Sequence, residues 1–173
     1  MKQGILTVLG CGGSSGVPKI GNDWGRCDPT EPRNRRTRPS IAVQSGSDQI
    51  VVDTGVDFRE QLNRENISTI TAVLYTHLHS DHINGIDDLR ILRDKAGKNI
   101  PIYATADNLA LLRTRFEYMF EQVTEFYPAA LTPCTISPQD MGQKMTIGEG
   151  FEFTPFLQDH VNVMSLGFRF GDV

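Results

Sequence analysis

The chain has 173 residues, of which 39% are hydrophobic and 22% are charged, and its formal net charge is −4. This length suits one globular domain, and the acidic balance argues against a generally basic nucleic-acid-binding surface. The sequence holds no run of the ~20 apolar residues that a membrane-spanning helix needs, and its three widely spaced cysteines do not form a disulfide framework. We therefore expect a cytoplasmic protein with residues 1–173 in a single domain.

Apolar and alternating runs predict a series of short strands. In chain order, these strands are predicted at residues 5–9, 40–43, 49–52, 72–75, 100–103, 145–147, 151–156 and 164–170. The first of them is expected to be buried, because β-forming residues fill it between two glycines. A glycine-rich turn at residues 10–18 and a long loop at residues 19–38 follow it. Loops longer than ~12–15 residues are usually functional or disordered.

Helical spacing of apolar residues occurs in three places. Phe58 and Leu62 lie four residues apart and predict a short helix. Residues 83–93 continue this spacing and predict that a helix begins at the preceding histidine-rich segment. Residues 109–119 predict an amphipathic helix with Asp107 as its N-cap. Strands alternate with helices early and hairpin-like strands come late, so we expect a mixed α+β fold.

The histidine-rich segment is the strongest chemical signal in the sequence. His77, His79 and His82 fall within six residues, with Asp81 among them. Alternate residues of an extended chain face the same side, so His77 and His79 can meet one cation. Imidazole and carboxylate groups together suit Zn²⁺, Mn²⁺ or Fe²⁺. The alternative is a surface cluster, or core histidines that are satisfied by hydrogen bonds.

The segment THLHSDHINGI resembles the H-x-H-x-D-H signature of the metallo-β-lactamase superfamily. The resemblance extends along the chain through LGCGGSSGVP, DWGRCDP, RNRRTRPS, VVDTG and PFLQDH, in the order found in the branch that includes phosphoribosyl 1,2-cyclic phosphate phosphodiesterases. It implies a metallo-β-lactamase-type αβ/βα sandwich that binds two divalent ions, zinc or manganese. It also implies hydrolysis of a cyclic or diester phosphate by a metal-activated water.

The resemblance also implies a role for each histidine. His77, His79 and His160 would hold the first metal ion, and Asp81 and His82 would hold the second and act in catalysis. A single histidine after a strand is often incidental, so the assignment of His160 depends on the resemblance.

The other site residues implied by the family lie in turns. Asp53 would hydrogen bond to a metal-bound histidine and fix its tautomer; alternatively it is a simple turn residue. Gly12, Gly13, Ser14 and Ser15 would form a substrate loop beside the metals, or else an ordinary tight turn.

Four arginines follow in the long loop, at Arg33, Arg35, Arg36 and Arg38. They are either solvated or recognise phosphate through the guanidinium fork. Some relatives place a cysteine cluster for structural zinc near Cys27. Since one cysteine stands here, we expect no such site.

Superfamily members with two metals usually supply a bridging aspartate and a further histidine after the third histidine. Here only Asp172 follows His160, so we interpret the chain as truncated within the second half of the fold. Exposed apolar surface and strand edges would then favour association, including a homodimer.

The leading hypothesis is a phosphodiesterase for a small phosphate ester, without a membrane or a nucleic acid as partner. Two alternatives stay open: a transfer-RNA 3′-processing endonuclease, and an inactive fragment that binds one metal or none.

Overall fold

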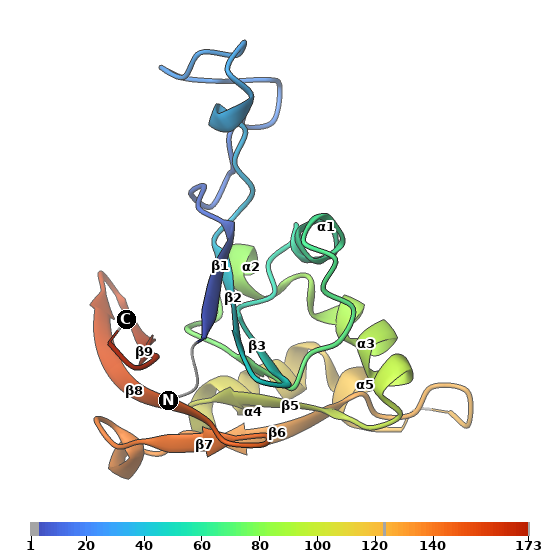
Figure 1. Cartoon of the computed structure of the whole chain (residues 1–173). Coiled ribbons are helices and arrows are strands. Elements are labelled where there is room, and N and C mark those ends of the chain that lie inside the picture. The colour runs from blue at the N-terminus through green and yellow to red at the C-terminus, as the bar shows by residue number, and fades with distance from the viewer. Residues whose placement is uncertain (1–3, 123, 173) are drawn as a thin grey trace.

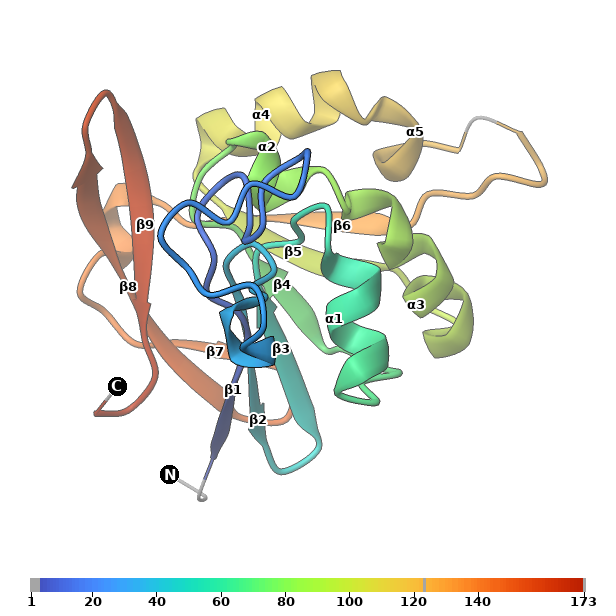
Figure 2. The same cartoon turned by 90° about the horizontal axis from the view of Figure 1, so that it is seen from above.

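The computed structural model describes residues 4–122 and 124–172, in which two sheets and a set of helices form three layers (Figures 1 and 2). The larger sheet has the strand order β1-β2-β3-β4-β5-β6, and the smaller sheet has the order β7-β8-β9. The strands are β1 (Ile5–Gly10), β2 (Ser40–Ser45), β3 (Asp48–Val52), β4 (Ala72–Leu74), β5 (Ile100–Ala104), β6 (Leu131–Thr135), β7 (Met145–Ile147), β8 (Phe151–His160) and β9 (Val163–Arg169).

The helices cover one face of the larger sheet, and the smaller sheet covers the other (Figure 2). The α-helices are α1 (Phe58–Arg64), α2 (Ser80–Ile83), α3 (Leu89–Ala96), α4 (Ala106–Arg115) and α5 (Glu117–Phe120). Three short 3₁₀ helices are η1 (Pro32–Asn34), η2 (Ile86–Asp88) and η3 (Pro138–Asp140). No helix among the described residues is long and apolar enough to cross a membrane.

Strands β3 and β4 are buried on both faces, which explains why their sequences are almost continuously apolar. Val51 and Val73 point into the core beneath the helices. Their neighbours Val52 and Leu74 point into the second core, between the two sheets. The two strands run parallel, and so do β4–β5 and β5–β6. The carboxyl ends of β3 and β4 therefore lie side by side, and the candidate site forms there.

Strand β1 is less buried than the sequence predicts. Ile5 is 62% exposed, Leu6 39% and Val8 55%, while Leu9 is buried. The strand pairs only with β2, at the edge of the larger sheet. Apolar β-forming residues indicate a strand, but they do not indicate how many neighbours cover it, so this part of the prediction was wrong.

The helices begin and end differently from the prediction. A helix begins within the histidine-rich segment as predicted, but from Ser80 onward the chain forms α2, η2 and α3 in place of one continuous helix. The predicted helix at residues 109–119 begins earlier and is interrupted at Phe116, between α4 and α5. Its N-cap is Thr105, whose hydroxyl accepts a hydrogen bond from the Asn108 N–H, so the assignment of Asp107 was wrong.

Strand β8 reaches His160, four residues beyond its predicted end, so this histidine lies within the β8–β9 hairpin. Strand β6 was not predicted, and it lies at the other edge of the larger sheet. It contains Pro133, which cannot donate a backbone hydrogen bond and is therefore found mostly in edge strands.

The long loop between β1 and β2 extends away from the layers as an arm (Figure 1). Val17 and Arg36 pair across its base through two backbone hydrogen bonds. Gln61 of α1 holds the same region, because its side-chain amide donates to the Thr37 hydroxyl and the Arg38 carbonyl. The arm is therefore anchored next to the end of the sheet where the site lies.

Candidate metal centre

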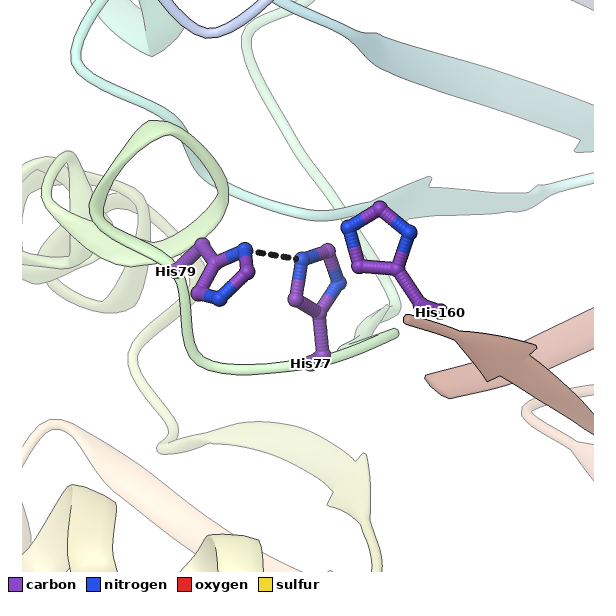
Figure 3. Close-up of side chains that lie close together, drawn as sticks. All are labelled: His77, His79 and His160. Atoms are coloured by element: carbon purple, nitrogen blue, oxygen red, sulfur yellow. Dashed lines mark hydrogen bonds between the residues drawn. The ribbon is translucent and has the colours of Figure 1, made fainter. Parts of the chain in front are cut away.

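Three histidines meet where the two sheets approach each other (Figure 3). His77 and His79 lie in the extended segment after β4, and His160 is the last residue of β8 in the other sheet. One side-chain nitrogen from each lies within 4.8 Å of the other two. The structure thus brings together residues that are far apart in sequence, including the one that was assigned by resemblance alone.

The spacing of these nitrogens fits a tetrahedral metal ion. His77 Nε2 and His79 Nδ1 are 3.0 Å apart. Two nitrogens bound at 2.0–2.1 Å to one tetrahedral zinc would be separated by about 3.3 Å. Without an ion, one of the two nitrogens carries a proton and donates it to the other. A small displacement would convert this pair into two ligands of a shared cation.

Asp81 and His82 lie beside this cluster in the short helix α2. The ring centroids of His77 and His82 are 4.1 Å apart, and His82 Nε2 lies 3.4 Å from Asp81 Oδ2. The two side chains therefore converge on a position next to the three-histidine cluster. An imidazole and a carboxylate there are suitable ligands for a second divalent ion.

Asp53 connects the end of β3 to the histidine-rich segment. It has a φ of 64°, in the left-handed region that aspartate tolerates better than most residues. Its carboxylate is buried and accepts a hydrogen bond of 2.6 Å from His82 Nδ1. It also accepts bonds from the Thr76 backbone N–H at 2.8 Å and the Thr76 hydroxyl at 2.7 Å. Asp53 is thus both a turn residue and the hydrogen-bonding partner of His82.

Two glycines let the backbones pack closely behind the motif. A Cβ atom at Gly55 would overlap the carbonyl oxygen of Asp81, and a Cβ atom at Gly85 would overlap the carbonyl oxygen of Gly55. Backbone hydrogen bonds from Thr54 N to His82 O and from Gly85 N to Thr54 O, each 2.8 Å long, fix the same contact. The turn after β3 therefore sets the position of α2.

The histidines differ in their electrostatic surroundings. Burial lowers the pKa of His77 to about 4, and charges on His82, His79 and His160 act in the same direction. Burial also acts to lower the pKa of His82, but the hydrogen bond and charge of Asp53 outweigh it and raise that pKa. Burial raises the pKa of Asp53, against the opposing hydrogen bonds from His82 and Thr76. His77 is therefore neutral near pH 7, as a metal ligand must be.

The site opens to solvent through a cavity of about 620 Å³. It is lined by Thr76, His77, His82, Gln158, Asp159, His160 and Ser165. His79 and His160 are exposed, while His77 and Asp81 are buried at the inner side. This size is within the range of cavities that bind small molecules.

Two contacts next to the site were not predicted from the sequence. Arg115 of α4 donates a 3.1 Å hydrogen bond to the carbonyl oxygen of Leu78, the residue between the first two histidines. Thr76 contacts both Asp53 and His77 through its hydroxyl. The position of Thr76 directly before His77 was the available signal for its role. Nothing in the sequence connected Arg115 to the motif.

The glycine-rich loop is held near the site through Arg38. The Arg38 side chain pairs with Asp57, 3.0 Å away, and donates to the carbonyl oxygen of Ser14. Arg38 also lies beside Gly55, which contacts Asp81. No hydrogen bond among the described residues joins Gly12, Gly13, Ser14 or Ser15 to a histidine.

The other arginines of the arm have separate contacts. Arg33 pairs with Glu31, Arg35 lies over the Trp24 ring, and Arg36 lies 3.7 Å from the Cys11 sulfur. The structure therefore does not bring these three arginines to the histidines.

The chain is similar to a protein-family model and to a solved structure. A family model described as a beta-lactamase superfamily domain matches residues 48–172. A crystal structure described as a new diphosphatase from the PhnP family is 37% identical, with a TM-score of 0.82, and the match covers 97% of this chain and 62% of that chain.

Two curated relatives carry other names. An octanoyltransferase of Porphyromonas gingivalis (strain ATCC BAA-308 / W83) is 31% identical over 169 residues, which are 96% of this chain and 33% of that protein. A ribonuclease Z of Mycobacterium sp. (strain KMS) is 39% identical over 64 residues, which are 36% of this chain and 22% of that protein. The chain thus spans about a third of the first relative and less than two thirds of the similar crystal structure.

Proposed function

Because the chain belongs to the beta-lactamase superfamily, we propose that it is a metal-dependent hydrolase that cleaves a cyclic or diester phosphate in a small substrate. The observation that carries this proposal is the convergence of His77, His79 and His160 within 4.8 Å, next to Asp81 and His82. The similarity to a diphosphatase along 97% of the chain supports a phosphorus centre as the point of attack.

Each residue has a definite part in this proposal. His77, His79 and His160 would hold one divalent ion, and Asp81 and His82 would hold a second. Bound divalent ions lower the pKa of water toward 7 and neutralise charge that develops on phosphate oxygens. Zinc and manganese both suit this set of imidazole and carboxylate ligands.

Other residues would act on the substrate and on the ligands. The glycine-rich loop, Gly12 to Ser15, would approach the phosphate group through Gly13, Ser14 and Ser15, which are exposed, whereas Gly12 is buried. The contacts of Arg38 support this proposal, because its side chain donates to the Ser14 carbonyl and pairs with Asp57 at the start of α1. Asp53 would keep His82 in the tautomer that leaves Nε2 free, because its carboxylate accepts the Nδ1 proton.

The test begins with the metal content of the purified chain by elemental analysis. Hydrolysis of bis(p-nitrophenyl) phosphate is then measured in Mn²⁺ and in Zn²⁺. We expect bound metal and turnover, and we expect Asp81→Asn to lower both. Asp94→Asn is the matched control, since Asp94 pairs with Arg93 on the surface of α3. A chain that binds both ions and hydrolyses no phosphodiester would contradict the proposal.

A transfer-RNA 3′-processing activity is the second candidate, and the ribonuclease Z match favours it. That match covers 36% of the chain, and a ribonuclease Z of Gemmatimonas aurantiaca matches 80% of it at 25% identity, against 97% at 37% identity for the diphosphatase. The net charge of −4 also offers little general attraction to RNA. A short transfer-RNA precursor and a nucleoside 2′,3′-cyclic phosphate, tested side by side, separate the two activities.

The octanoyltransferase similarity adds a third substrate to the same experiment. The matched region is a third of that protein, so its name describes a much longer chain. An octanoyl thioester therefore serves as an additional probe. Faster cleavage of this probe than of either phosphate ester would indicate that the substrate is an acyl thioester and not a phosphodiester.

A further inference from the structure

Thr76 links β4, Asp53, His77 and the second sheet through its polar groups. Its backbone N–H and its hydroxyl both contact the Asp53 carboxylate, at 2.8 and 2.7 Å. Its hydroxyl also lies 3.0 Å from His77 Nδ1. Its carbonyl oxygen accepts a 2.9 Å hydrogen bond from the backbone N–H of Leu166 in β9. All of its polar groups therefore have a partner in or beside the candidate metal centre.

The hydroxyl of Thr76 has one proton, and this decides the direction of its two contacts. An ionised carboxylate only accepts hydrogen bonds, so the hydroxyl donates its proton to Asp53. Towards His77 the same oxygen can only accept, which requires the proton of the neutral imidazole to be on Nδ1. The lone pair of His77 is then on Nε2, the nitrogen that faces His79.

We propose that Thr76 is a positioning residue. Its hydroxyl donates a hydrogen bond to Asp53 and accepts one from His77, and it thereby fixes the metal-binding tautomer of His77. Asp53 does the same for His82 directly, through Nδ1. One buried carboxylate thus orients a ligand of the first ion and a ligand of the second. This inference rests on the proposed metal site, and it adds a residue that does not itself bind a metal.

The backbone of Thr76 extends the same arrangement to the third histidine. Leu166 lies in the strand that pairs with β8, and the register places His160 opposite Val163 in that hairpin. The Thr76 carbonyl therefore connects the hairpin that carries His160 to the segment that carries His77. A side-chain substitution leaves this backbone bond in place, so it tests the hydroxyl alone.

The test compares Thr76→Val, Thr76→Ser and Thr71→Val. Valine has the shape of threonine without the hydroxyl, and serine keeps the hydroxyl. Thr71 is a matched control, because its hydroxyl donates to the buried carboxylate of Asp48 at the opposite end of β4. Zinc affinity is measured by competition with a chelating dye, and unfolding temperature is measured in parallel.

Loss of the hydroxyl should weaken zinc binding by about 10- to 100-fold, the range for partners of metal-bound histidines. We expect Thr76→Ser to bind zinc nearly as tightly as the parent protein. Thr71→Val is expected to keep the parent affinity even if it lowers the unfolding temperature. Zinc affinity that is unchanged in Thr76→Val, or equally reduced in Thr71→Val, would overturn the inference.

A second readout separates this inference from the proposed function. The ¹⁵N chemical shifts of histidine in the metal-free parent protein report which nitrogen of His77 carries the proton. A proton on Nδ1 that is lost from this position in Thr76→Val supports the inference, even if the chain shows no phosphodiesterase activity. A proton on Nε2 in the parent contradicts it. If Thr76→Val does not fold, Thr76→Ser and the parent spectrum still decide the question.

Discussion

Replacing Val161 with glycine should stabilise the protein. Val161 and Asn162 form the two-residue turn between β8 and β9, and Val161 has a φ of 59°. The first position of such a turn, when φ is positive, favours glycine. A β-branched residue in this region of backbone space is an outlier. The strain lies directly beside His160, the only proposed ligand from the second sheet.

The size of the effect follows from two opposing contributions. A left-handed backbone costs a residue with a Cβ roughly 1–2 kcal/mol. The substitution by glycine also lowers the free energy of unfolding by about 0.4–1 kcal/mol, because glycine increases the conformational freedom of the unfolded chain. Val161 is 86% exposed, so its side chain contributes little buried area. The net gain should be about 0.5–1 kcal/mol, or an increase of roughly 1–4 °C in unfolding temperature for a chain of this length.

Thermal and urea unfolding of the two chains measure this gain, and Asn22→Gly is the control. Asn22 has the same φ of 59° and is also exposed, but asparagine tolerates this conformation. Its replacement should leave stability unchanged or slightly reduced. An unfolding temperature for Val161→Gly no higher than that of Asn22→Gly would refute the assignment of strain to the hairpin turn.

Three other predictions follow from contacts around the site. Gly55→Ala should destabilise the protein by about 1–3 kcal/mol and weaken the binding of the second ion, because the added Cβ would overlap the Asp81 carbonyl oxygen. Gly13→Ala should unfold at the parent temperature, because no atom lies within 4 Å of the position of its Cβ. Arg115→Met should reduce zinc affinity by freeing the backbone between two histidines, whereas Arg113→Met, which breaks a surface ion pair, should not. Burial and a hydrogen bond to a carboxylate raise the pKa of Tyr118 to about 12. Its contribution to stability is therefore present below pH 10 and lost as the pH rises toward 12, which absorbance at 295 nm and Tyr118→Phe can verify.

The local part of the candidate metal centre could be predicted from the sequence, because four of its residues fall within the segment from His77 to His82. Their mutual geometry depends on short-range rules: alternation after a strand, and then the first turn of a helix. His160 could be placed only by resemblance. His160 lies in a hairpin of the other sheet, and no local sequence pattern indicates that this hairpin meets the histidine-rich segment.

Other features of the fold depend on tertiary contacts that the sequence pattern does not encode. The helical spacing after the motif continues through Gly85, yet the chain breaks into α2 and α3, because Gly85 packs against the backbone of Gly55. Thr105 and Asp107 are both suitable N-caps, and the choice depends on where β5 ends. The exposure of β1 depends on its single neighbour in the sheet. Pattern analysis finds such elements but not what covers them.

His77 and His79 follow a strand of the larger sheet, whereas His160 ends a strand of the smaller sheet, so an ion shared by the three would connect the two sheets. An ion bound by His77, His79 and His160 would act as a cross-link between the middle of the chain and its last hairpin, in the way that a disulfide closes a long loop. Amide hydrogen exchange in β8 and β9 should therefore slow markedly when zinc is added, while exchange in α3, on the far side of the larger sheet, should change much less. The metal would in this way determine whether the hairpin opens independently or only together with the whole domain.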